Sequence, residues 1–234
     1  MEPKPNPSPS EDHAMTCQID GTDSISQNES SNETIHAGFW TPNTARFPVV
    51  CIGMSAGGVA PLQTLIRTLS PKIGMAFVVI HHLRQEHPTL LPEILSSCTS
   101  MPVQLAEPSI PILPNHIYIL PSGQEMNLTD GAFALKPRTK LRGWSNVVTM
   151  FLDSLIESRH AGIAVILSGM DADGTEALKA FKRRGGIIIA QAPGTAWMRD
   201  MPVAAIKTGA VDYVLEPEAM AGQIERIAEE LRLS

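Results

Sequence analysis

The chain has 234 residues, enough for one sizeable domain with its own core. Its hydrophobic content of 43% is typical of globular proteins, and no uninterrupted apolar run reaches membrane-spanning length, so we expect no membrane insertion. The formal net charge is -6, and residues 1–46 hold seven acidic and two basic residues, which leaves the remainder close to neutral. A near-neutral domain lacks the basic surface of a general nucleic-acid-binding protein, so we expect no nucleic-acid partner.

The first 46 residues differ in composition from the rest of the chain. Residues 1–46 are rich in Pro, Ser, Asn, Thr and Glu and show no hydrophobic period, which predicts a disordered polar tail before a domain over 47–234. The N-terminus lacks the apolar segment of a secretory signal, and the three cysteines have no metal-ligand spacing. Both features favour a cytoplasmic protein with reduced thiols.

From Phe47 onwards, buried strands and amphipathic helices are predicted to alternate. "PVVCIG" (48–53) and "MAFVVIHHL" (75–83) read as buried strands, and "GVAPLQTLIRTL" (58–69) places its leucines on one helical face. "MNLTDGAFAL" (126–135), which follows "HIYILP", alternates apolar and polar residues around Asp130-Gly131, which predicts a hairpin.

The remaining elements continue the alternation. We expect helices over 87–98, 148–159, 175–185 and 201–209 and from 217 onwards, and strands over 162–169, 186–191 and 210–216. Strands that are apolar on both faces are typical of a parallel sheet covered by helices. The predicted fold class is therefore α/β, with a doubly wound, mostly parallel sheet, helices on both faces and an appended antiparallel hairpin.

Reactive side chains follow three of the predicted strands. Ser55 follows "VVCIG", the pair His81-His82 ends "FVVI", and Asp171 and Asp173 follow "VILSG". In an open parallel α/β sheet, sites form outside the carboxyl ends of the strands. A serine, a histidine and a carboxylate at one edge are the parts of an acyl-transfer site.

The turn around Ser55 fits a nucleophile on physical grounds. Gly53, Gly57 and Gly58 relieve crowding at a sharp strand-to-helix turn, so that the Ser55 hydroxyl can project and a substrate can approach. The free N–H groups of the following helix favour a developing oxyanion. A neutral imidazole can take the serine proton, and a carboxylate holds that imidazole in the required tautomer.

Other interpretations of these segments stay open at this point. A glycine-rich turn can also bind a nucleotide, although "GMSAGG" has neither P-loop spacing nor a clean G-x-G-x-x-G pattern. "GMDADG" can be a plain turn or, with His82 and His87, a metal site, but no His-x-x-x-His or His-x-His spacing occurs. The order Ser, His, Asp also differs from the order Ser, Asp, His of α/β-hydrolases.

Five long motifs in fixed order point to one family. "VVCIGMSAGG", "GMAFVVIHHL", "PNHIYILP", "LSGMDADG" and "DMPVAAIKTGAVDYVL" resemble the catalytic domain of CheB-type protein-glutamate methylesterases, most closely the form fused to a methyltransferase. The resemblance covers residues 47 to about 230. It implies that Ser55 is the nucleophile, His82 the base and Asp173 the carboxylate. It also places the turn residues Ala56 and Gly57 and the Met170 main chain at the oxyanion site.

The resemblance also implies an activity. The family hydrolyses γ-glutamyl methyl esters on the cytoplasmic helices of methylated chemoreceptors through an acyl-enzyme, and it deamidates particular receptor glutamines by the same route. It requires no metal or organic cofactor. Methylated chemoreceptors, and other chemotaxis signalling proteins, are therefore the expected partners of a cytoplasmic enzyme.

Three features depart from the family pattern. Asp171 replaces a small residue, and a second carboxylate there would raise the pKa of its neighbours or compete for the histidine. His81 is a rival imidazole beside His82, at the position of a family glutamine. No receiver domain is expected before residue 47, because the tail is too short and too polar.

The sequence also contains a basic segment and leaves three rival functions open. "LKPRTKLRGW" offers Arg138, Arg142 and Trp144 as contacts for an acidic receptor helix, although a solvated loop is an equal alternative. The first rival function is a scaffold protein whose catalytic geometry is spoiled by Asp171 or His81. The second is a serine hydrolase of another small ester or amide, and a nucleotide-binding protein ranks third.

Overall fold

The computed structural model describes residues 47–82, 89–138, 146–158 and 160–233. All of these residues belong to one compact unit of the chain. The predicted tail, 1–46, lies outside the described residues, and the domain boundary at residue 47 stays a prediction.

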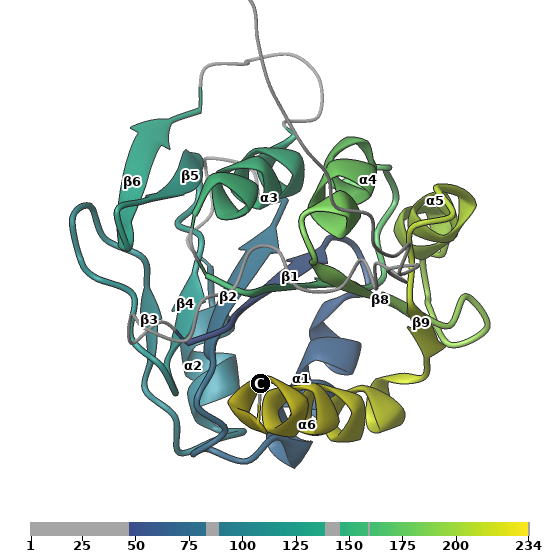
Figure 1. The fold of residues 1–234 in the computed structure, drawn as a ribbon, viewed down its shortest axis with the longest axis horizontal. Helices are drawn as coiled ribbons and strands as arrows, with labels where there is room; N and C mark the ends of the chain where they lie inside the picture. Colours follow the sequence, from purple (N-terminus) through teal and green to yellow (C-terminus); the bar gives the residue numbers. More distant parts are fainter. Residues whose placement is uncertain (1–46, 83–88, 139–145, 159, 234) are drawn as a thin grey trace, which may run out of the picture. The chain divides into compact units, whose positions relative to one another are not determined.

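Seven parallel strands form the central sheet in the order β3-β4-β2-β1-β7-β8-β9 (Figure 1). Their bounds are Val49–Met54 (β1), Ala76–His81 (β2), Val103–Leu105 (β3), Ile117–Ile119 (β4), Gly162–Ile166 (β7), Ile187–Gln191 (β8) and Tyr213–Leu215 (β9). β1 and β2, near the centre, are buried along their whole length. Continuous apolar runs such as "VVCIG" and "AFVVI" suit this position, because each strand is covered on both faces.

Helices cover both faces of the sheet (Figure 1). One face packs against α1, α2 and α6, and the other packs against α3, α4 and α5. Their bounds are Val59–Thr68 (α1), Leu91–Ser96 (α2), Val147–Glu157 (α3), Thr175–Arg183 (α4), Asp200–Lys207 (α5) and Pro217–Leu233 (α6). The predicted doubly wound α/β fold is therefore confirmed.

The predicted hairpin forms a separate antiparallel sheet of β5 (Gln124–Thr129) and β6 (Ala132–Pro137). Its turn residues Asp130 and Gly131 both have positive φ, 51° and 77°, as a tight hairpin turn between these strands requires. Apolar side chains of the hairpin join the core cluster that contains α3. The Leu128 N–H donates to Ser154 Oγ of α3 at 2.9 Å, which fixes the hairpin on that helix.

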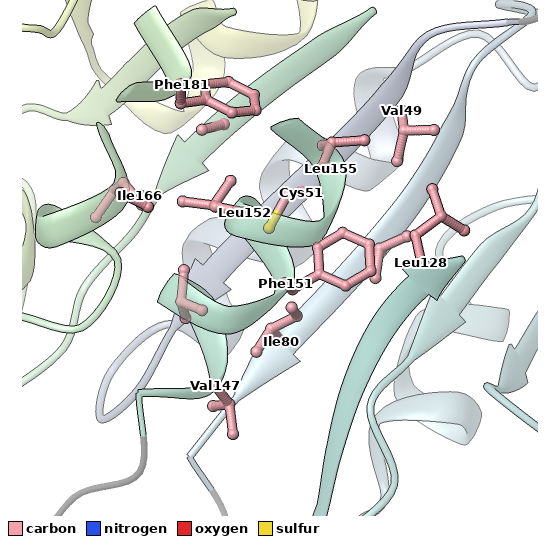
Figure 2. Packing of buried hydrophobic residues seen from close by; sticks show 14 of the residues in the cluster. Val49, Cys51, Ile80, Leu128, Val147, Phe151, Leu152, Leu155, Ile166 and Phe181 are labelled. Atoms are coloured by element: carbon pink, nitrogen blue, oxygen red, sulfur yellow. The ribbon is translucent and has the colours of Figure 1, made fainter. Parts of the chain in front are cut away.

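Helix α3 lies over the middle of the sheet. Its side chains Phe151 and Leu152 pack in the same buried cluster as Cys51 of β1 and Ile80 of β2 (Figure 2). Burial of large apolar side chains of this kind contributes about 2 kcal/mol each. The N-terminus of α3 is thereby held beside the carboxyl ends of β1 and β2.

The strand order changes direction at β1. From β1 the chain first adds β2, the edge strand β3 and then β4 between β3 and β2, and it afterwards places β7 on the other side of β1. Loops after β1 and β7 therefore leave the sheet in opposite directions, which creates the crevice where α/β sheets bind ligands. In the ranges described, no helix is long and apolar enough to cross a membrane.

The close approach of β7 to α4 yields a stability prediction. A Cβ added at Gly162 would lie 2.5 Å from Phe181 Cζ, inside a buried cluster that cannot move freely. We expect Gly162→Ala to lower the free energy of unfolding by about 1–3 kcal/mol through overpacking. Urea denaturation of both proteins measures this difference.

A matched control uses the same substitution on an exposed helix. Gly222 lies within α6 and has no heavy atom within 4 Å of an added Cβ. Gly222→Ala is expected to raise the free energy of unfolding by about 0.5–1 kcal/mol, because alanine loses less backbone entropy. Equal effects of the two substitutions would contradict the described packing of β7 on α4.

Candidate active site

Ser55 and His82 leave the sheet on neighbouring strands. Met54 and His81, the last residues of β1 and β2, are register partners, so Ser55 and His82 follow at equivalent positions. On the other side, the Ser55 N–H donates to the Ser168 carbonyl oxygen at 2.9 Å, which extends the pairing of β1 with β7. The loop after β7 then carries Asp171 and Asp173 to the same edge. The structure thus gathers all four predicted side chains.

His82 contacts Asp173 directly. Its Nε2 atom lies 2.7 Å from Asp173 Oδ2, and the two side chains are only 3% and 2% exposed. A buried histidine on a buried carboxylate is the pairing that orients a catalytic base. His82 Nδ1 also lies 2.6 Å from Asp171 Oδ2, so both ring nitrogens face a carboxylate.

Asp173 is fixed by the N-terminus of α3. Its Oδ2 accepts from the Val148 N–H at 2.8 Å, and its Oδ1 accepts from the N–H and the Oγ1 of Thr149 at 3.0 and 2.9 Å. The first turn of a helix has free N–H groups and a positive dipole end, both of which suit an anion. Burial raises the pKa of Asp173, but His82 and the two backbone N–H groups outweigh burial and hold that pKa below its usual range.

The two adjacent histidines have opposite electrostatic surroundings. Burial lowers the pKa of His82, but hydrogen bonding and charge from Asp171 and Asp173 outweigh it and raise that pKa to about 9. Burial, followed by the charges of His82 and Arg138, lowers the pKa of His81 to about 4. At neutral pH His82 is therefore mostly an imidazolium, whereas His81 is a buried neutral imidazole.

A buried serine holds the turn that carries Ser55. Ser168, which is 0% exposed, donates its Oγ proton toward the Ala56 carbonyl at 2.8 Å and accepts from the Met198 N–H at 2.9 Å. Its own N–H donates to Gln191 Oε1 at 2.9 Å. The turn after β1 is thus tied to the segments after β7 and β8.

Glycine is required at position 57 of this turn. Gly57 has a φ of +79°, and a Cβ added there would lie 2.8 Å from Ser168 Oγ and 2.9 Å from Trp197 Cβ. Within the residues that the structure describes, no hydrogen-bond acceptor meets the N–H groups of Ala56, Gly57 and Met170. Three backbone donors predicted for the oxyanion site are thus available at the edge that carries Ser55.

The predicted substrate contacts are only partly described. Arg138 follows β6, and its N–H donates to the Gly123 carbonyl at 2.8 Å. Its charge acts on His81, which places the guanidinium near the strand ends that carry the site. Arg142 and Trp144 lie outside the described residues. Among those that are described, no group of three or more His, Cys, Asp or Glu side chains is arranged to hold a metal ion.

Two residues that hold the site in place, Thr149 and Ser168, were not predicted from the sequence. Thr149 also accepts from the Gly174 N–H through Oγ1 at 2.9 Å, so it bridges α3 and the loop of Asp173. A threonine in the first turn of a predicted helix is a signal for such a contact. Ser168 lies at the end of an apolar strand, where a lone serine gives no comparable signal because its partners come from distant segments.

Comparisons with known proteins agree with this geometry. The family model of the CheB methylesterase matches residues 50–224. The crystal structure of the Thermotoga maritima CheB methylesterase catalytic domain superposes with a TM-score of 0.73 at 30% identity, and covers 77% of this chain and 98% of that one.

Curated relatives carry the same family name. A protein-glutamate methylesterase/protein-glutamine glutaminase of Geobacillus kaustophilus is 32% identical over 185 residues, and one of Burkholderia pseudomallei is 30% identical over 185 residues. These matches cover 76% and 78% of this chain, but the chain spans about half the length of either relative, 53% and 54%. A putative enzyme of this name from Leptospira interrogans is 28% identical, with 75% of this chain and 92% of the relative covered. The chain therefore belongs to the CheB methylesterase family.

Proposed function

We propose that this domain hydrolyses γ-glutamyl methyl esters on chemoreceptor helices, with Ser55, His82 and Asp173 as its catalytic triad. The observation that carries the proposal is the buried contact of His82 with Asp173 at the strand end next to Ser55. Relatives with this fold are named for methylesterase and glutaminase activity. The same site therefore also deamidates glutamine side chains, in which ammonia replaces methanol as the leaving group.

The first half-reaction forms an acyl-enzyme. Because Asp173 holds Nε2, Nδ1 is the nitrogen of His82 that takes the Ser55 proton. Ser55 Oγ then bonds to the ester carbonyl carbon, and the carbonyl oxygen becomes an oxyanion. His82 returns the proton to the methoxy oxygen as the C–O bond breaks, and methanol leaves.

The second half-reaction reverses the roles. Water loses a proton to His82 and attacks the acyl carbon, and Ser55 leaves with that proton. In both steps the N–H groups of Ala56, Gly57 and Met170 stabilise the oxyanion. One such donor contributes about 3 kcal/mol to the transition state in comparable sites.

The surface around Ser55 suits a protein chain as substrate. The side chains of Met170 and Trp197 are 51% and 76% exposed, and Trp197 packs against the Ser55 turn at Gly57. Arg138, together with Arg142 and Trp144, provides positive charge and an aromatic contact for an acidic receptor helix. Such receptor helices are cytoplasmic, so the proposal places the domain in the cytoplasm.

The nucleophile is tested by Ser55→Ala. Methanol release from chemoreceptor membranes that carry labelled methyl esters should fall by about a thousandfold or more, because no acyl-enzyme can form. Far-UV circular dichroism should show an unchanged fold, since Ser55 is held through its backbone.

Ser97→Ala is the matched control. Ser97 is exposed at the end of α2, where its Oγ donates to the Ile94 carbonyl at 2.7 Å and lies 3.8 Å from Cys98 Sγ. This variant should release methanol at the wild-type rate. Release that survives Ser55→Ala would show that another residue is the nucleophile, and hydrolysis of small esters without release from receptors would indicate a different substrate.

The substrate contact is tested by Arg138→Ala. We expect KM for methylated receptor to rise about three- to tenfold with little change in kcat, because the guanidinium binds substrate and transition state alike. Arg67→Ala, at the far end of α1, removes the same charge from an exposed site and should leave KM unchanged. Equal effects of the two variants would assign the change to net charge and contradict a specific contact.

A further inference from the structure

The two carboxylates on His82 differ in how firmly they are held. Asp173 accepts from Val148 and Thr149 as well as from His82, so it is part of the N-terminus of α3. Asp171 accepts the Asp173 N–H through Oδ1 at 3.0 Å, and none of the hydrogen bonds within the described ranges ties it to α3. Asp173 is therefore tied to α3 as well as to the ring, whereas Asp171 is held by fewer of the described hydrogen bonds.

The contact with Asp171 is short and buried. His82 Nδ1 and Asp171 Oδ2 are 2.6 Å apart. Attraction between charges holds this pair, and such attraction is strong because the two side chains are only 3% and 11% exposed. Nδ1 is the same atom that the proposed mechanism assigns to the Ser55 proton.

We propose that Asp171 competes with Ser55 for Nδ1 of His82. The site is then inactive until the Asp171 carboxylate moves away from the imidazole. This inference rests on the proposed function of His82 as the base. It makes Asp171 a positioning residue that acts through His82 and does not touch the substrate.

The charges around His82 agree with such a state. Burial lowers its pKa, and Asp171 and Asp173 raise it to about 9. Of the other titratable groups at this edge, His81 is neutral at physiological pH, and Arg138 acts on His81. Cys51 of β1 stays a protonated thiol, because burial and then the charge of Asp173 raise its pKa. The two carboxylates thus keep the imidazole protonated at neutral pH.

The position of Asp171 suggests how a bound substrate could break its contact with Nδ1 of His82. Met170, which immediately precedes Asp171, has a side chain 51% exposed beside the Ser55 turn. A receptor helix seated over Ser55 contacts this loop and can draw Asp171 away from the ring. Binding of the protein substrate and deprotonation of His82 are then coupled.

The test compares Asp171→Asn with wild type in the full chain. Asparagine keeps the shape of the side chain and removes its charge, so the pKa of His82 should fall by about one to three units. The acidic limb of the pH profile of kcat/KM, along which activity rises as His82 loses its proton, should move to lower pH by the same amount. Near neutral pH, activity should rise by about tenfold per unit.

Two further variants exclude simpler explanations. Asp171→Gly also removes the carboxylate and should lower the pKa of His82 in the same direction. This variant replaces Asp171→Asn in the test if the asparagine variant folds poorly. Asp153→Asn removes one exposed carboxylate from α3, remote from the His82 contacts, and should leave the profile in place. A shift with Asp153→Asn would indicate a general charge effect.

A readout without turnover separates this inference from the proposed function. Nitrogen-15 NMR of the histidine rings reports the titration of His82 in wild type and in Asp171→Asn, whether or not either protein is an esterase. A His82 pKa that is equal in both proteins would overturn the inference. A lower pKa combined with lower activity at every pH would also overturn it, because Asp171 would then orient the base. A lower pKa with no methanol release from any variant would sustain the charge contact and refute the esterase proposal, and with it the competition for Nδ1.

Discussion

The hydrogen bonds of the Asp173 carboxylate are the interaction on which the site depends. One side chain accepts from the first turn of α3 and from His82, and the loop that carries it begins at the end of β7. The first turn of α3 and the ring of His82, the proposed base, are therefore held by the same two oxygen atoms. The N–H groups of α3 hold the carboxylate ionised, and an ionised carboxylate is needed to stabilise a protonated imidazole.

The fold places the remaining parts around this carboxylate. β1 lies between β2 and β7 in the sheet, so the turn of Ser55 has His82 on one side and the loop of Asp171 and Asp173 on the other. Ser168 holds that turn in place, because its Oγ donates a hydrogen bond to the Ala56 carbonyl. Central strands buried on both faces are rigid, and rigidity is what keeps a nucleophile in reach of its base.

The sequence predicted those parts of the structure that follow local rules. Continuous apolar runs identified β1, β2 and β7, and the residues after them were Ser55, His82 and Asp173, which the structure brings to one edge. The short edge strand β3 was missed, because three partly exposed residues carry no pattern. The roles of Ser168 and Thr149 depend on contacts between distant segments, which no local pattern contains. The contact of Asp171 with Nδ1 of His82 could not be predicted, since the sequence allowed either a raised pKa of neighbouring groups or competition for the ring.

Labelling with a fluorophosphonate, which reacts with activated serines, tests directly whether Ser55 is the nucleophile. The tryptic peptide of residues 47–67 contains Ser55 as its single serine, so its mass identifies the modified residue. At about pH 9, near the pKa of His82, part of the protein has a neutral imidazole that can act as a base. We therefore expect covalent labelling of this peptide in wild type and none in Ser55→Ala. Labelling confined to another peptide, or labelling of folded Ser55→Ala equal to wild type, would contradict a nucleophile at Ser55.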